Sequence, residues 1–313
     1  MIARVWAAAS NRRASGAAAA GKGWRVSDFP LPGKGDAAVA VPAPGAGTGQ
    51  WAGAPSAALD DGGFLVAYRM RVVDQRGAAT IVARSTDGEH LTTVATLDKD
   101  RFGAESLERP ALLRTDAGRW RLYVSCATPN GKHWRIDVLE APEAAALEDA
   151  EPVTVFPGDD HTAVKDPVIR RFGGDWQAWI CCHTLDERGE EDRMRTAYAT
   201  SEDGLHWDWH GTVLRPRPGE WDARGARVTA VLADGRATYD GRATKEENFS
   251  ERTGIAESTG EHGHLRAVGD APASDARYLD ILPLPHGGYR LFYEAPLPDG
   301  SHELRTELVP RTS

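Results

Sequence analysis

Charged residues recur where strands are predicted to begin, and they could do two kinds of chemistry. In the stretch AVKDPVIRRFGGDWQAWICC, Asp166 lies between Lys165 and Pro167. Other cations take similar places along the chain, namely Arg109, Arg224, Arg227 and Arg277. If these cations converge, they form a positive pocket for a carboxylate, sulfate or phosphate group. They could equally pair into a structural salt-bridge ring with Glu108, Asp166, Asp222 and Asp280, and both arrangements can hold together.

The overall composition excludes several classes of partner. The 313 residues carry a formal net charge of -9, which argues against a nucleic-acid partner because phosphate binding needs a cationic face. No run of about 18 apolar residues occurs, so no membrane partner is expected. No spacing typical of metal ligands is found, and neither a metal nor a cofactor is predicted.

The cysteines and the N-terminal residues bear on where the protein works. Cys126, Cys181 and Cys182 are odd in number and two are adjacent, which excludes a simple disulfide framework. Arg12 and Arg13 stand where a signal peptide needs its apolar centre. We therefore expect a cytoplasmic protein.

Short segments rich in aromatic and branched residues predict an all-β protein. Each follows a turn that contains glycine, and the segments are FLVAYRMRV, RWRLYVSCA, DWQAWICC and GYRLFYEA. They are typical of the second strand of a hairpin. Helical periodicity is confined to APEAAALEDAE.

These hairpins recur five times, and the recurrence predicts the fold. The strands ahead of them are GAPSAAL, ERPALL, KDPVIR, ARVTAVL and RYLDILPL. A sheet of about four strands repeated at roughly 55 residues is typical of a β-propeller. We predict a single five-bladed β-propeller over residues 45–313, with residues 1–44 as a leader and possible source of a blade-closing strand. The inner strands should begin around a common axis at Ala54, Arg109, Asp166, Ala226 and Tyr278.

A family resemblance becomes visible in the motifs of the third blade. The phrase YATSEDGLHWDW and the Asp-Pro pair opening an inner strand resemble the five-bladed propeller glycoside hydrolases, which include arabinanases, xylosidases, invertases and levansucrases. The resemblance covers nearly the whole chain as a blade pattern. It implies that a carbohydrate binds in the central funnel and that Asp166 points into it.

The chemical motifs of that family are kept only in part. Blade one has Ala52, Gly53 and Ala54 where the resemblance implies an Asp. Blade four has Arg224 and Arg227 near the place of the implied Glu acid. On blade two, the sequence LERP, which holds Glu108 and Arg109, loosely resembles the Arg-Asp-Pro motif of the invertase branch. The family's usual mechanism therefore cannot be carried over whole.

Glycoside cleavage needs two carboxyl groups beside the scissile bond, so other acids must be considered. The catalytic candidates are Asp166, Glu108, Asp222 and Asp280. Asp240 and Glu294 are further acids that could reach the funnel. The ordinary fate of such acids is a solvated turn or rim.

Aromatic and loop residues complete the predicted binding site. Trp51 and Trp221 precede inner strands and could stack on a sugar face, and Tyr278 shares the face of Asp280. His183 ends a second strand at the same funnel mouth. The charged segment Ala237–Glu257 is predicted to be a loop that covers the funnel, with Tyr239 and Asp240 at its hinge.

The predicted function is hydrolysis of a small glycoside or oligosaccharide in the central funnel. One alternative is a glycoside phosphorylase or an enzyme on an anionic sugar, for which the cations would hold the anion. Another alternative is a propeller that binds a glycan without cleaving it, which the missing blade-one Asp favours. In each case the partner is a small carbohydrate, neutral or anionic.

Overall fold

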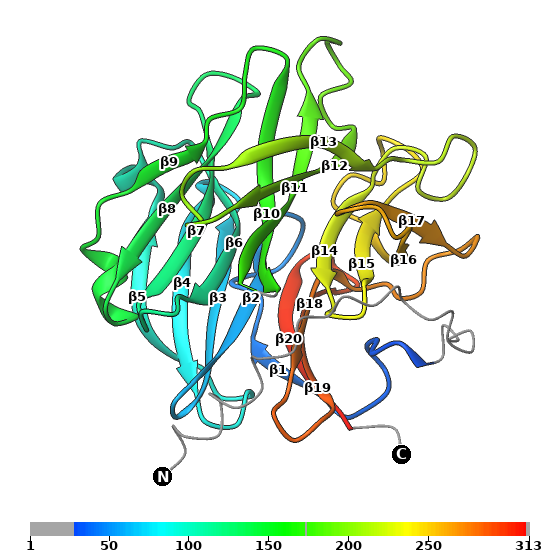
Figure 1. Cartoon of the computed structure of the whole chain (residues 1–313). Coiled ribbons are helices and arrows are strands. Elements are labelled where there is room, and N and C mark those ends of the chain that lie inside the picture. The colour runs from blue at the N-terminus through cyan, green and yellow to red at the C-terminus, as the bar shows by residue number, and fades with distance from the viewer. Residues whose placement is uncertain (1–27, 173, 311–313) are drawn as a thin grey trace.

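The structure is a computed structural model that describes residues 28–172 and 174–310. Within them, twenty strands and two short 3-10 turns form sheets arranged around a common axis (Figure 1). The 3-10 turns are η3 (Lys99–Phe102) and η4 (Ala145–Glu148), so the helix expected in APEAAALEDAE is a single tight turn. No helix in the described part of the chain is long and apolar enough to span a membrane.

The first three blades are four-stranded antiparallel units. Blade one consists of β2 (Trp51–Asp60), β3 (Gly63–Val72), β4 (Arg76–Ser85) and β5 (Thr92–Asp98). Blade two consists of β6 (Leu107–Arg114), β7 (Trp120–Ala127), β8 (Trp134–Ala141) and β9 (Val153–Phe156). Blade three consists of β10 (Thr162–Phe172), β11 (Asp175–Thr184), β12 (Met194–Ser201) and β13 (Asp208–Leu214).

The last two blades complete the circle. Blade four consists of β14 (Arg227–Val231), β15 (Arg236–Gly241), β16 (Arg252–Ser258) and β17 (Leu265–Val268). Blade five consists of β18 (Arg277–Pro283), β19 (Tyr289–Pro296), β20 (His302–Val309) and, from the other end of the chain, β1 (Ala37–Val41). The blade-closing strand therefore comes from residues just after the segment GWRVSDFPLPG.

The innermost strands form a closed circle. Strand β2 contacts β6, β6 contacts β10, β10 contacts β14 and β14 contacts β18, which returns to β2. In Figure 1 the red strand β18 lies between yellow β14 and blue β2. A parallel pair between Trp51 of β2 and His302 of β20 joins the last blade to the first. The predicted five-bladed β-propeller is confirmed.

A hydrophobic cluster fills each of the five interfaces between blades. For example, Leu65 and Val82 of blade one pack with Leu122 of blade two, and Phe64 packs with Phe292 of blade five. The strands expose alternate side chains to two neighbouring blades, so nearly continuous apolar segments such as FLVAY are buried on both faces. This packing explains why the hairpins recur at one period.

Every inner strand carries a β-bulge near its start. Strand pairing skips one residue between Gly53 and Ser56 in blade one, and equivalent shifts occur in the other four blades. In three of these bulges a residue other than glycine has a positive φ: Ala54 at 53°, Asp166 at 49° and Tyr278 at 49°. Such bulges redirect side chains and are common beside functional sites.

One polar side chain bridges each pair of neighbouring blades at the inner strands. The backbone N–H of Leu112 donates to Ser56, that of Asp166 to Ser125, and that of Val228 to Thr196. Thr253 donates to the carbonyl of Ala276 between blades four and five. Asp280 closes the circle, because its Oδ2 accepts the N–H of Ala57 at 2.7 Å. Its other oxygen lies 2.9 Å from Arg170.

Removing the Asp280 carboxylate should therefore loosen the junction between blades five and one. Asp280→Ala leaves the Ala57 N–H and the partly buried Arg170 without their acceptor, and breaking a buried ion pair costs about 3 to 5 kcal/mol. We expect that loss in the free energy of unfolding measured by urea denaturation. Asp61→Ala, which removes an exposed carboxylate paired with Arg114, should change it little. Equal effects of the two substitutions would contradict the bridging role.

Candidate functional site in the central funnel

A cavity of about 350 Å³ lies at one end of the inner strands and is lined by residues of all five blades. We call it the funnel cavity. Seven residues predicted from the sequence line it: Trp51, Glu108, Lys165, His183, Arg227, Arg277 and Tyr278. The one residue type that dominates the lining is arginine, and its partners decide the chemistry of the cavity.

Arg227 is buried between three blades and organises one side of the cavity. Its Nη1 donates to Asp166 Oδ2 at 3.0 Å and to the Tyr278 hydroxyl at 2.8 Å, and its Nη2 donates to Asp240 at 2.7 Å. The guanidinium carbon lies 3.8 Å from the centre of the Tyr278 ring. Burial opposes the charge of Arg227, but Tyr278, Asp240 and Asp166 outweigh that effect and raise its pKa. The cation is therefore permanent.

Asp166 lies directly behind the cavity wall. It is fully buried, and its Oδ2 is shared by Arg227, Tyr278 and, at 3.5 Å, Lys165. Its Oδ1 has no hydrogen-bond partner among the described residues. The resemblance implied an Asp166 that points into the funnel; in the structure Asp166 instead contacts residues that line it.

A second set of ion pairs organises the opposite side. Arg69 binds Glu108 at 3.0 Å and Glu294 at 2.6 Å. Arg277 binds Glu294 at 2.8 Å and Glu251 at 2.7 Å. These contacts join residues of blades one, two, four and five.

Gly53 makes room for the Glu294 carboxylate. A Cβ at position 53 would lie 2.1 Å from Glu294 Oε2, so the Glu294 carboxylate, which Arg69 and Arg277 hold, would have to move. Residue 53 is among the three positions of blade one where the resemblance implies an Asp. A carboxylate is thus present at this place, but blade five supplies it, and Arg69 and Arg277 pair with it.

The two buried acids that line the cavity are ionised. Burial would raise the pKa of Glu108, but the charges of Arg69, Lys165 and Arg71 outweigh it and lower that pKa to about 2. Burial likewise opposes the charge of Glu251, and Arg277, Arg227 and Arg242 lower its pKa to about 2. Each carboxylate can act as a base or a nucleophile at neutral pH, and neither carries a proton to donate.

His183 is a neutral base at the cavity wall. Burial and the neighbouring Lys165 lower its pKa to about 4. Its Nδ1 lies 2.7 Å from the carbonyl oxygen of Glu191, a contact in which Nδ1 must donate. Nε2 is therefore the unprotonated nitrogen, and it lies 3.5 Å from Cys181 Sγ.

The aromatic residues are distributed differently from the prediction. Trp51 is only 1% exposed, because His302 stacks on it and Arg71 and Phe249 cover it. It has no free face for a sugar. Trp134, which sequence reasoning missed, lines the cavity and is half-buried.

The remaining predicted residues do not line the funnel cavity. Asp240 and Glu294 are buried behind it and pair with its arginines. Arg109 lies among the inner strands and donates to the carbonyls of Pro55 and Thr229, within 3.9 Å of Asp280. On blade four, Asp222 accepts from Arg217 and Tyr239, Trp221 stacks on Tyr239, and Arg224 binds Asp192.

The predicted covering loop is shorter than expected. Residues 242–251 connect β15 to β16, and Arg242, Lys245, Asn248, Phe249 and Glu251 of this connection line the cavity. Tyr239 and Asp240 belong to β15 and are buried, so they are not at its hinge. Phe249 has a φ of 79° and is 38% exposed. A bulky residue in this conformation is uncommon and marks a functional candidate.

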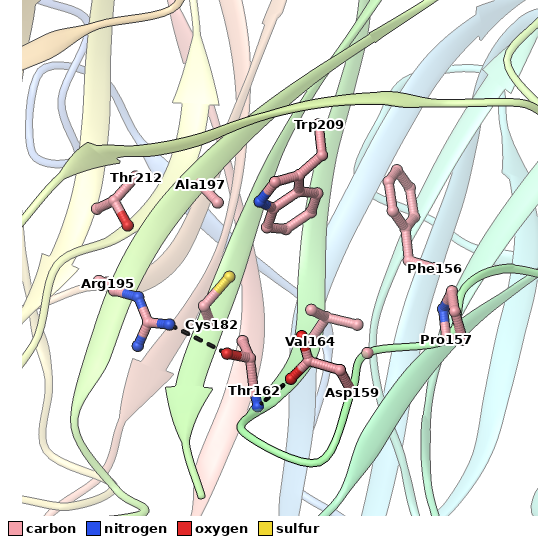
Figure 2. A pocket seen from close by; sticks show the side chains of 11 residues that line it. Phe156, Pro157, Asp159, Thr162, Val164, Cys182, Arg195, Ala197, Trp209 and Thr212 are labelled. Atoms are coloured by element: carbon pink, nitrogen blue, oxygen red, sulfur yellow. Dashed lines mark hydrogen bonds between the residues drawn. The ribbon is translucent and has the colours of Figure 1, made fainter. Parts of the chain in front are cut away.

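A second cavity, of about 250 Å³, lies between blades two and three and differs in character (Figure 2). Its lining includes Phe156, Val164, Cys182 and Trp209, and its Arg195 donates to Thr162 at 3.2 Å. It contains none of the predicted site residues. No group of three or more metal-ligating side chains is found among the described residues.

The lowered pKa values of the funnel acids predict how stability depends on pH. Glu108 and Glu251 have an ordinary pKa of 4.5, and both values fall to about 2 in the folded protein. Their contribution is therefore complete well above pH 4.5 and is lost as the pH falls towards 2, on the order of 3 kcal/mol each. Urea denaturation between pH 7 and 2 should show the decline. Glu251→Gln should reduce its slope, and an unchanged slope would contradict the assignment.

Comparison with known proteins concerns the fold first. No protein-family model matches the sequence, and no curated protein sequence matches it either. Solved structures do match. A thermostable family-43 glycoside hydrolase has a TM-score of 0.61 and 13% identity, covering 82% of this chain and 88% of that one.

Two further similar structures come from work on mannosides. The β-1,2-mannobiose phosphorylase from Listeria innocua, in complex with β-1,2-mannobiose, has a TM-score of 0.58 and 15% identity, over 84% of this chain and 90% of that one. A structure from the GH130 family of mannoside phosphorylases, which contains glycoside hydrolases that target β-1,2 mannosidic linkages in Candida mannan, has a TM-score of 0.59 and 15% identity, over 89% and 95%. At these identities the chain is shown to share the propeller fold of glycoside hydrolases and phosphorylases.

Proposed function

We propose that this protein cleaves the glycosidic bond of a small glycoside or oligosaccharide that binds in the funnel cavity. The observation that carries the proposal is the ionised Glu108 carboxylate at the cavity wall, held by Arg69 at 3.0 Å. The fold supports it, because the similar structures are glycoside hydrolases and phosphorylases. Trp134 offers an aromatic surface for a sugar in the same cavity.

Each residue near Glu108 takes a definite role in this proposal. Glu108 acts on the anomeric centre or on a water beside it, as a nucleophile or a base. Asp166 is a positioning residue, because it fixes Arg227 and Tyr278 and does not line the cavity itself. His183 is a neutral polar group of the wall, with its Nδ1 donating to the Glu191 carbonyl and its unprotonated Nε2 beside the Cys181 thiol.

In most glycoside hydrolases one carboxylic acid with a raised pKa protonates the leaving group, and a second, ionised carboxylate acts as base or nucleophile. This cavity differs in the first of these two groups. None of the Asp and Glu side chains that line it among the described residues has a raised pKa. Cleavage should therefore be fastest for leaving groups that need no protonation. Activity against aryl glycosides should rise steeply as the pKa of the departing phenol falls, and a flat dependence would contradict the absence of an acid.

Phosphorolysis is a second candidate, and the cationic lining favours it. Nine Arg and Lys side chains line the cavity against four Asp and Glu. Asp166, Asp240 and Glu294 behind the wall pair with three of the arginines, and the cations that remain suit a phosphate nucleophile. A panel of nitrophenyl glycosides and neutral disaccharides, including β-1,2-mannobiose, should be incubated with and without phosphate. Free sugar in both conditions supports hydrolysis, and sugar phosphate formed only with phosphate supports phosphorolysis. Ligand binding without product would indicate a glycan-binding propeller instead.

Replacing the two central carboxylates should separate their roles. Glu108→Gln keeps the shape but removes the negative charge, and we expect kcat to fall by about 10² to 10⁴. Asp166→Asn should lower kcat less and should raise KM, because it loosens Arg227 and Tyr278 without touching the bond. Glu140→Gln is a matched control on blade two, where Glu140 pairs with Arg119 and Arg121 away from the cavity. Full activity of a folded Glu108→Gln variant would remove Glu108 from the mechanism.

A further inference from the structure

The funnel cavity concentrates positive charge that its own acids do not neutralise. Of the six lysines in the chain, Lys132, Lys165 and Lys245 line this one cavity. The whole chain carries a net charge of -9. A positive interior in an acidic protein needs an explanation in terms of what binds there.

Four of the arginines are accounted for by the protein itself. Each makes close ion pairs with buried or partly buried carboxylates: Arg69 with Glu108 and Glu294, Arg227 with Asp166 and Asp240, Arg242 with Asp192 and Glu251, and Arg277 with Glu251 and Glu294. These arginines are structural, because their Nη nitrogens contact the carboxylates. The Nε of each, like that of Arg71, is buried without a hydrogen-bond partner among the described residues.

Arg71 and Lys165 differ, because neither side chain donates a hydrogen bond to any described residue. The closest carboxylate oxygen to Arg71 is Glu108 Oε1, at 3.7 Å from Nη1, and its Nε is buried without a partner. The closest to Lys165 Nζ is Asp166 Oδ2 at 3.5 Å. Their side chains are only 15% and 11% exposed, so bulk water satisfies these donors poorly.

The two cations flank Glu108 from different blades. Arg71 lies near the end of β3 in blade one, Lys165 lies in β10 of blade three, and Glu108 lies in β6 of blade two, between them. Aromatic rings back both cations, with Trp51 at 4.7 Å from Arg71 and Trp134 at 4.4 Å from Lys165. The rings fix the two side chains, and their N–H groups remain available to the cavity.

We propose that Arg71 and Lys165 bind an acidic group carried by the sugar, a carboxylate or a sulfate. The inference rests on the proposed function, because it requires that a glycoside occupies the funnel cavity. An ionised oxygen forms stronger hydrogen bonds with these cations than a hydroxyl does, and it offsets the cost of burying their charges. Lys132 and Lys245 extend the positive charge along the same lining and attract the acidic ligand.

Calorimetric titration of matched sugars tests the proposal without any need for turnover. The probes are gluco-, galacto- and manno-configured disaccharides, each with its uronic acid counterpart, and inorganic phosphate. In at least one configuration the acidic sugar should bind about 10-fold to 100-fold more tightly than the neutral one. Raising the salt concentration should reduce that difference.

Variants assign the preference to the two cations. Arg71→Gln and Lys165→Gln should each lower the affinity for the acidic sugar about tenfold and leave the neutral sugar nearly unchanged. Lys165→Arg should retain the preference, and Arg84→Gln, at an exposed arginine of blade one, is the control. Thermal unfolding of each variant verifies that it is folded.

Three outcomes would overturn the inference, and they differ from failure of the proposed function. Equal affinity for neutral and acidic sugars is one. Equal losses for both sugars in the variants is another, since it would make the cations structural. Phosphate binding at Arg71 and Lys165 with no gain for acidic sugars is the third, because the site would then serve a free anion. If no sugar of either kind binds, the proposed function fails together with the inference.

Discussion

Burial of the Arg227 guanidinium is the interaction on which the site depends. Removing a cation from water costs several kcal/mol, and close, well-directed acceptors must offset that cost. Here the acceptors come from three blades: Asp166 of blade three, Asp240 of blade four and Tyr278 of blade five. The charge is tolerated only when these blades dock in one relative position. The same docking places Lys165, Arg277 and Glu108 around one cavity.

The fold could be predicted from the sequence because the same pattern of buried strands and turns repeats in every blade. Every blade buries two faces against neighbours, so strands and turns recur at one spacing whatever the chemistry of the site. The charged residues at the inner-strand starts could be found in the same way. Which of them face the cavity could not, because a one-residue bulge lies at that point of every inner strand. A shift of one residue exchanges the two faces of a strand.

Residues next to one another in the chain show how the bulge determines which side chains line the cavity. Lys165 lines the cavity and Asp166 lies behind it, whereas Arg277 and Tyr278 both line it. Asp280, two residues further on, bridges blades instead. Trp134 and Arg71 were missed because they lie on strands away from the inner-strand starts, and only the closed circle of blades brings those strand ends together. Residues 242–251 lie within the predicted loop, but the contacts of their side chains depend on blades one, three and five.

The seam between the two ends of the chain has a consequence for synthesis. Strand β20 pairs with β1 and also, through His302, with the first residue of β2. Glu307 on the same strand accepts the backbone N–H groups of Gly33, Lys34 and Gly35. None of these contacts can form until the last strand has left the ribosome. Until then the apolar face of blade one that includes Phe64 lacks its partner Phe292 of blade five, and exposed apolar surface of this kind promotes misassembly of a growing chain.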